Sequence, residues 1–261
     1  MSHWIRFEHK NKISFGALRD GQITVHTGNL FDQPQPTSEL IPLENVKLLT
    51  PTEPTKMVGL VNNLRAAAIK QNLSIPEEPL FFIKPTSCFL PTNTNIPKPT
   101  SYNGRVMYEG ELGIVFGKTC KNISETEVED CIFGYTCVND VTAFQLIDSN
   151  ESFAQWSRAK SFDGFGSFGP TIATNIDPQT LQIQTLLNGR VRQDYPVSDM
   201  IFPPNKLVQL ISRDMTFYPG DVICCGTSLG VLPMRPGTTV EIKIDGIGTL
   251  HNTYGKEKNS D

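Results

Sequence analysis

Long apolar segments are absent from this chain of 261 residues. No stretch approaches the roughly 18 uninterrupted apolar residues that a membrane-spanning helix needs. Residues 1–10 carry charges where a secretory signal peptide has its apolar segment. An excess of positive charge is also absent, because 23 Lys and Arg stand dispersed against 27 Asp and Glu. We therefore expect a cytoplasmic protein with neither a membrane nor a nucleic acid as partner.

Cysteine and histidine are scarce, which disfavours further kinds of site. The six cysteines form no CxxC pair, so neither a disulfide framework nor a thiolate zinc site is expected. Buried, reduced thiols are the simplest interpretation. The four histidines lie in the N-terminal segment and in the last strand candidate, so the sequence indicates no histidine-based catalytic site: His3, His9, His26 and His251.

The first 54 residues have the composition of a small β subdomain. Residues 13–18 and 22–26 are strand candidates with a turn between them, and the Pro-containing stretch 32–36 interrupts the pattern. A second Pro-rich segment, 49–54, precedes a change of composition. We therefore predict three parts: an N-terminal β subdomain (1–54), a main domain (55–255) and a polar tail expected to fray (256–261).

The main domain is predicted to be β-rich with few helices. No strand candidate is regularly followed by a crossover helix, so a doubly wound parallel sheet is not expected. A mixed-sheet α+β fold with peripheral helices is predicted instead. The expected strands are 57–61, 80–85, 134–138 and 221–225. Hairpins are expected to turn at Asn188-Gly189 and at Asp245-Gly246. Helices are expected at 66–70 and 206–213, and a short one is expected to begin at the capping box 124–127.

Two glutamates stand at the head of an apolar strand candidate. Glu109 and Glu111 are two residues apart, and this spacing places both side chains on one face of a strand. Like charges near the core are costly unless a metal ion or a lysine neutralises them. The alternative interpretation is an edge strand whose glutamates are exposed to solvent.

A third carboxylate, Asp140, ends the next strand candidate, and a helix is expected to begin at Thr142. An aspartate at this place is often a helix N-cap, which is the structural alternative. Together with Glu109 and Glu111, however, it completes a set of oxygen ligands that suits Mg²⁺ or Mn²⁺.

Two Gly-rich segments add positive charge and hydroxyl groups. Segment 155–170 is predicted to be a loop, in which Lys160 is a candidate to pair with a metal-bound carboxylate or an anionic ligand. A surface lysine is the alternative. The loop around Gly226, Thr227 and Ser228 offers backbone N–H groups and two hydroxyls to an anion, although any tight turn has a similar composition.

Four of these segments resemble, in order, the signature blocks of the fumarylacetoacetate hydrolase superfamily. The resemblance spans residues 55–255 and points to members of the 2-hydroxyhepta-2,4-diene-1,7-dioate isomerase and fumarylpyruvate hydrolase type. The matching segments are 108–113, 138–143, 158–166 and 225–230.

This resemblance implies a β-roll catalytic domain, a homodimer and a 2-oxo acid substrate. It implies that Glu109, Glu111 and Asp140 bind Mg²⁺ or Mn²⁺. It also implies that Lys160 contacts the ligand sphere or the substrate, and that Thr227 with its loop holds the substrate. The reactions of the family are C–C hydrolysis, decarboxylation and isomerisation, which share an enolate stabilised by the metal ion.

The chain departs from the family pattern at two places. Hydrolytic and decarboxylating members carry a His and, three residues later, a Glu. These positions fall on Arg65 and Ala68 here, and a shift by one residue does not restore the pair. Phe144 and Gln145 stand where many members have Arg and Asp. Arg65, a permanent cation, is a candidate to hold a distal carboxylate.

Three functions follow from this pattern. The leading hypothesis is a metal-dependent isomerase or tautomerase, or a decarboxylase, acting on an unsaturated 2-oxo dicarboxylate, because hydrolysis lacks the base that activates water. The first alternative is a C–C hydrolase of the fumarylpyruvate or acylpyruvate type. The second is a catalytically silent metal-binding relative.

Overall fold

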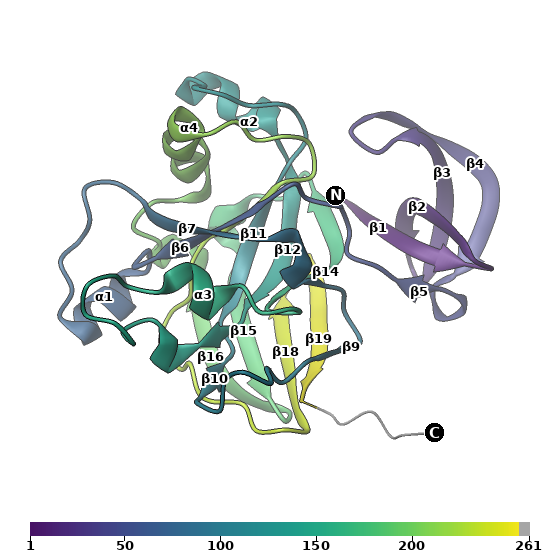
Figure 1. The fold of residues 1–261 in the computed structure, drawn as a ribbon. Helices are drawn as coiled ribbons and strands as arrows, with labels where there is room; N and C mark the ends of the chain where they lie inside the picture. Colours follow the sequence, from purple (N-terminus) through teal and green to yellow (C-terminus); the bar gives the residue numbers. More distant parts are fainter. Residues whose placement is uncertain (256–261) are drawn as a thin grey trace.

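The computed structural model describes residues 1–255, in which the strands form one large sheet and two smaller ones (Figure 1). The large sheet is mixed and has twelve strands in the order β4-β3-β2-β1-β14-β12-β11-β17-β6-β7, while β5 pairs with β1 and β8 with β14. The predicted β-rich α+β class is confirmed. The strands of this sheet are β1 (Ser2–His9), β2 (Lys12–Arg19), β3 (Gln22–Asn29), β4 (Asp32–Pro42), β5 (Lys47–Leu48), β6 (Met57–Val61), β7 (Leu80–Lys84), β8 (Phe89–Leu90), β11 (Gly110–Phe116), β12 (Ile132–Asp140), β14 (Gly166–Thr174) and β17 (Val222–Cys224).

The N-terminal strands β1 to β4 form an antiparallel meander on one side of the molecule (Figure 1). The Pro-containing stretch 32–36, which the sequence predicted to interrupt the strands, belongs to β4 instead. This strand is at the edge of the sheet, where the missing N–H of a proline costs no ladder hydrogen bond. The meander has a core of its own and joins the rest through β1 and β14, and the predicted boundary at residue 54 stays a prediction.

The five-stranded sheet contains both predicted hairpins, which are confirmed. Asn188 and Gly189 both have positive φ, 50° and 72°, as a tight two-residue hairpin turn requires. The strands of this sheet are β9 (Thr94–Ile96), β15 (Gln182–Leu187), β16 (Arg190–Pro196), β18 (Thr238–Ile244) and β19 (Gly248–Tyr254), and the two-stranded sheet consists of β10 (Val106–Met107) and β13 (Thr142–Ala143).

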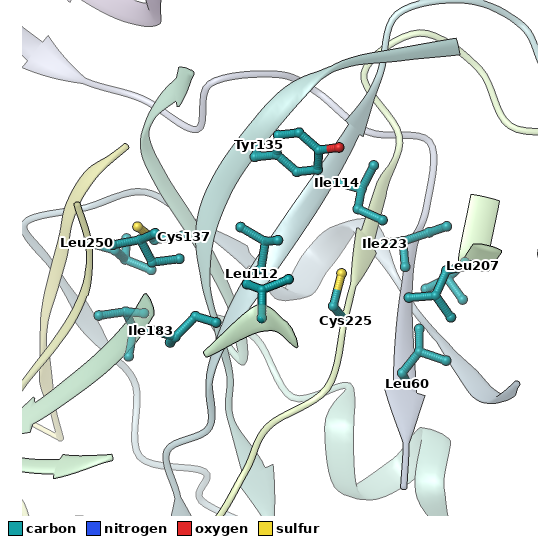
Figure 2. Close-up of a cluster of buried hydrophobic side chains, with 14 of the residues drawn as sticks. Leu60, Leu112, Ile114, Tyr135, Cys137, Ile183, Leu207, Ile223, Cys225 and Leu250 are labelled. Atoms are coloured by element: carbon teal, nitrogen blue, oxygen red, sulfur yellow. The ribbon is translucent and has the colours of Figure 1, made fainter. Parts of the chain in front are cut away.

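The main core fills the space between the large sheet, the five-stranded sheet and α4 (Pro204–Asp214). Figure 2 shows Leu112 of β11 between Leu250 of the five-stranded sheet and Leu207 of α4. All six cysteines are buried, as predicted. Burial of apolar side chains at both faces holds β11 and β12 rigidly in the interior.

The helices are short and lie at the periphery: α1 (Arg65–Gln71), α2 (Val128–Cys131), α3 (Trp156–Lys160) and α4. The capping box of Ser124 and Glu127 is present and begins a 3-10 turn that leads into α2. Across residues 1–255, no helix combines the length and the apolar character needed to cross a membrane. The predicted tail, 256–261, lies outside the described residues.

Candidate metal centre

Antiparallel pairing of β11 with β12 brings the three predicted carboxylates together. Glu109 directly precedes β11, Glu111 lies within it, and Asp140 is the last residue of β12. One carboxylate oxygen from each residue lies within 4.8 Å of the other two. The exposed-edge alternative is wrong, because β11 is an internal strand and Glu111 is buried. We call Glu109, Glu111 and Asp140 the acidic cluster.

Asp140 is not a helix N-cap, because the short strand β13 follows it. The helix predicted to begin at Thr142 is therefore wrong. Pairing with β10 keeps Thr142 and Ala143 extended, and a 3-10 turn, Phe144–Leu146, comes next. As a result, Thr142 Oγ1 donates a hydrogen bond of 2.6 Å to Glu109 Oε1 and helps to orient this carboxylate.

Two buried lysines contact the acidic cluster. Lys160 ends α3, and its Nζ lies 2.8 Å from Glu109 Oε2 and 2.6 Å from Asp140 Oδ2. Lys84 ends β7, and its Nζ donates to Asp140 Oδ1 at 2.6 Å and to the Lys160 carbonyl oxygen at 2.5 Å. Only 1% of Lys160 is exposed, so the surface-lysine alternative is wrong. The two ammonium groups leave one formal negative charge on the acidic cluster.

Burial and neighbouring charges shift the pKa values in the cluster. Burial raises the pKa of Glu111 well above its ordinary value, and the charge of Asp140 adds to this effect. Burial also raises the pKa of Glu109, against the opposing attraction of Lys160. Burial also acts to raise the pKa of Asp140, but the positive charges of Lys160 and Lys84 outweigh burial, so the pKa of Asp140 lies below its ordinary value. At Lys160, Asp140 and Glu109 outweigh the effect of burial and raise the pKa of the ammonium group.

Glu111 supplies the observation that tests whether a metal ion fits. Its Oε2 accepts a hydrogen bond of 2.8 Å from the N–H of Gly226, but its buried Oε1 has no partner among the described residues. A buried carboxylate oxygen without a partner is costly. Three gathered carboxylates with a net negative charge are the kind of ligand set that Mg²⁺ and Mn²⁺ prefer. The acidic cluster therefore fits a divalent cation.

The predicted anion loop lies against the start of β11. Besides the N–H of Gly226, which is bound to Glu111, Thr227 Oγ1 donates to the Gly110 carbonyl oxygen at 3.0 Å. Ser228 is buried, and its carbonyl oxygen accepts from Gln193 Nε2 at 3.0 Å. These groups hold the loop in place, and the substrate-binding role of Gly226, Thr227 and Ser228 stays a prediction.

Two further expectations have different outcomes. Segment 155–170, predicted to be a loop, contains α3 and the first residues of β14, and this local helix is what aims Lys160 at the acidic cluster. Arg65 is exposed at the start of α1, and its guanidinium lies 3.5 Å from the Ile201 carbonyl oxygen. No contact within residues 1–255 joins Arg65 to the acidic cluster, and its catalytic role stays a prediction.

Sequence reasoning missed Lys84 and Gln193. The sequence does indicate a role for Lys84, because a charged residue that ends the apolar strand β7 needs a buried partner. No sequence pattern indicates a role for Gln193. Its amide links Gly110 and Thr227, with Oε1 accepting from the Gly110 N–H at 3.1 Å and Nε2 donating to Thr227 Oγ1 at 2.8 Å. These partners come together only through the packing of β16 against β11.

Comparisons with known proteins place these features in a family context. Residues 56–254 match the family model described as fumarylacetoacetate (FAA) hydrolase C-terminal, and residues 2–51 match one described as Rv2993c-like, N-terminal. Protein Rv2993c of Mycobacterium tuberculosis is 40% identical over 225 residues, which cover 85% of this chain and 83% of that protein.

Two similar proteins carry names of reactions. The oxaloacetate tautomerase YisK of Bacillus subtilis is 35% identical over 227 residues, covering 82% of this chain and 74% of that protein. The crystal structure of 2-hydroxyhepta-2,4-diene-1,7-dioate isomerase from Mycobacterium marinum superposes with a TM-score of 0.89 at 35% identity, covering 97% of this chain and 98% of that one.

Proposed function

Since this chain belongs to the fumarylacetoacetate hydrolase family, we propose that it isomerises or tautomerises an unsaturated 2-oxo dicarboxylate in a metal-dependent reaction that passes through an enolate. The family resemblance inferred from the sequence is thereby confirmed. The observation that carries the proposal is the acidic cluster, in which three strand-end carboxylates meet and one buried Glu111 oxygen has no partner among the described residues.

The residues around the acidic cluster fit this chemistry. Glu109, Glu111 and Asp140 would hold Mg²⁺ or Mn²⁺, which when bound polarises the keto oxygen of a 2-oxo acid and stabilises the charge formed on loss of a C3 proton. Lys160 supplies a second positive charge beside the same carboxylates. Its neighbours raise the pKa of its ammonium group, so Lys160 stabilises negative charge and donates hydrogen bonds but does not abstract the proton.

Lys84 changes the charge balance of the site. It pairs with Asp140 Oδ1, whereas Lys160 pairs with Asp140 Oδ2. Two ammonium groups and a divalent ion outweigh the three carboxylates by one formal charge. A net positive, largely buried site favours an anionic substrate such as a 2-oxo acid, because the charge attraction is little screened there.

The chain favours isomerisation over hydrolysis. Hydrolysis needs a general base to activate water, and such a base contributes about 10²–10⁴-fold to the rate. Arg65 and Ala68 occupy the places on α1 where hydrolytic relatives carry a His and a Glu, and neither side chain accepts a proton near neutral pH. The names of the tautomerase and isomerase relatives support the same choice.

Product analysis by NMR tests the proposed function. The Mn²⁺-loaded protein is incubated in D₂O with oxaloacetate and, separately, with fumarylpyruvate. We expect accelerated exchange of the C3 protons of oxaloacetate and no cleavage of fumarylpyruvate. The Glu109→Gln variant is the matched control, because it removes one charge from the acidic cluster while retaining the shape of the side chain.

Each other outcome assigns a different function. Pyruvate and fumarate formed from fumarylpyruvate would overturn the proposal in favour of the hydrolase. Pyruvate formed from oxaloacetate at the rate of C3 exchange would make the protein a decarboxylase. A protein that binds Mn²⁺ but accelerates neither reaction would be the silent relative.

A further inference from the structure

Arg105 directly precedes β10, which pairs with β13 beside the acidic cluster. In the β10–β13 pair, Met107 is opposite Thr142 and Val106 is opposite Ala143. The next step outward pairs Arg105 with Phe144, whose N–H donates to the Arg105 carbonyl oxygen at 3.0 Å. Thr142 contacts Glu109, so this ladder leads from the acidic cluster to Arg105.

The β10–β13 pairing places the Arg105–Phe144 pair next to the residues that contact the acidic cluster. Met107 of β10 is opposite Thr142, and Arg105 lies two residues before Met107, about 7 Å further along at roughly 3.3 Å per residue. Phe144 begins the 3-10 turn after β13, and its N–H continues the hydrogen bonding to Arg105. The Arg105 guanidinium carbon lies 5.2 Å from the centre of the Phe144 ring. Arg105 and Phe144 therefore lie one step along the β10–β13 pair from Thr142, which contacts Glu109.

The backbone of Arg105 is held by hydrogen bonds on both sides of its peptide unit. Its N–H donates to Gln145 Oε1 at 2.8 Å, and its carbonyl oxygen lies 3.1 Å from the Tyr102 hydroxyl, which also contacts that Gln145 oxygen. The Tyr102 ring stacks on Phe162, two residues after Lys160, with the ring centres 6.3 Å apart. The segment that carries Arg105 is thus fixed to the segment that carries Lys160.

The guanidinium of Arg105 has no carboxylate partner within residues 1–255. It is exposed, and it lies over Phe144, which is itself 45% exposed. Stacking on an aromatic ring occupies the face of a guanidinium and leaves its N–H edge free for a bidentate contact with a carboxylate. An anchored cation with a free edge is suited to binding an anion.

We propose that Arg105, supported by Phe144, binds the distal carboxylate of the substrate and makes the site selective for 2-oxo dicarboxylates over 2-oxo monocarboxylates. This inference rests on the proposed function, which places the 2-oxo acid end of the substrate at the acidic cluster. It also explains how a chain with Phe at position 144 binds a second carboxylate, since the cation comes from the facing strand. The step of about 7 Å from Met107, which is opposite Thr142, to Arg105 matches a short dicarboxylate.

The test compares oxaloacetate with 2-oxobutanoate, in which a methyl group replaces the distal carboxylate. C3 exchange gives kcat and KM, and calorimetry with the Mn²⁺-loaded protein gives Kd. In Arg105→Met we expect KM and Kd for oxaloacetate to rise about 10–100-fold, the size of a lost charge-assisted hydrogen bond. We expect kcat to change less than about threefold and 2-oxobutanoate to be unaffected, since only ground-state binding is removed.

Two further variants make the result specific. Arg105→Lys retains the charge without the bidentate edge and should weaken oxaloacetate binding by less than Arg105→Met does. Arg19→Met is the control, because it removes another exposed arginine charge, in β2, and should change the binding of neither substrate.

Equal weakening for both substrates, or no weakening for oxaloacetate, would refute the assignment of Arg105. Calorimetry separates this failure from that of the proposed function. A wild type that binds oxaloacetate through Arg105 but exchanges no C3 protons would overturn the reaction and support the binding role. Exchange of C3 protons by the wild type, together with an unchanged Kd for oxaloacetate in Arg105→Met, would support the proposed reaction and overturn the binding role of Arg105.

Discussion

A fully buried lysine needs partners for its charge, and Lys84 has two. It donates to Asp140 and to the Lys160 carbonyl oxygen, and it thereby ties the end of β7 to the end of β12 and to α3. Removal of Lys84 would leave three carboxylates with one ammonium group, that of Lys160, and a less compensated buried charge is strongly destabilising. At the residue scale, Lys84 is therefore a support on which the geometry of Asp140 and Lys160 depends.

We expect Lys84→Met to lower the free energy of unfolding by about 3–5 kcal/mol, because Asp140 loses a buried counter-charge. Denaturant titration of the metal-free protein measures this change. Lys118→Met is the matched control. Its ammonium lies 3.8 Å from Asp130 in an exposed pair, with side chains 64% and 82% accessible, and such pairs contribute less than about 1 kcal/mol. Similar losses in both variants would contradict the role of Lys84.

At the element scale, the position of β11 depends on its close contact with the five-stranded sheet. A Cβ at Gly110 would lie 2.0 Å from Thr185 Oγ1 in β15, so only glycine permits this approach. The same contact brings Gln193 of β16 to the Gly110 N–H. Gly110 stands between the two glutamates of the acidic cluster, and any displacement of β11 here moves both of them.

We expect Gly110→Ala to destabilise the protein by about 1–3 kcal/mol through overpacking and to weaken Mn²⁺ binding. Thr185→Ala removes the oxygen that the new methyl group meets, and this oxygen has no hydrogen-bond partner among the described residues. The double variant should therefore recover part of both losses in a double-mutant cycle measured by denaturant titration and calorimetry. Strictly additive effects would show that the contact does not position β11.

At the scale of the whole molecule, the proposed metal site joins segments that are far apart in the sequence. β7, β11, β12, α3 and the loop after β17 each contribute one or more contacts to the acidic cluster. A ligand that binds only when these segments are assembled stabilises the whole fold by mass action. The implied homodimer stays a prediction.

We expect Mn²⁺ at about one hundred times its Kd to add about 2.7 kcal/mol of stability, which corresponds to a rise of roughly 5–10 °C in Tm for a chain of this size. Differential scanning calorimetry measures the shift, and EDTA should reverse it. Asp140→Asn and Glu111→Gln should each lose most of the shift. Asp130→Asn, which neutralises an exposed carboxylate, should retain it. A full shift in Asp140→Asn would contradict the proposed site.

The sequence predicted the elements whose signals are local. The hairpin at Asn188 and Gly189, the α4 helix and the buried strand that contains Glu111 all follow from turn chemistry or apolar spacing within a few residues. The prediction was wrong at Thr142, because pairing with β10 overrides a helical pattern there. It was also wrong for the prolines of β4, which only an edge position tolerates.

The sequence by itself determined which chemical groups are present: the spacing of Glu109 and Glu111, the strand-end Asp140, and the absence of a His–Glu pair near Arg65. Only the tertiary structure showed that Lys84 of β7 joins the predicted Lys160 of α3 at the acidic cluster, because these elements come together across long sequence separations. The interaction between charges depends on their distance in space and not on their separation along the chain, so the fold decides which charges interact.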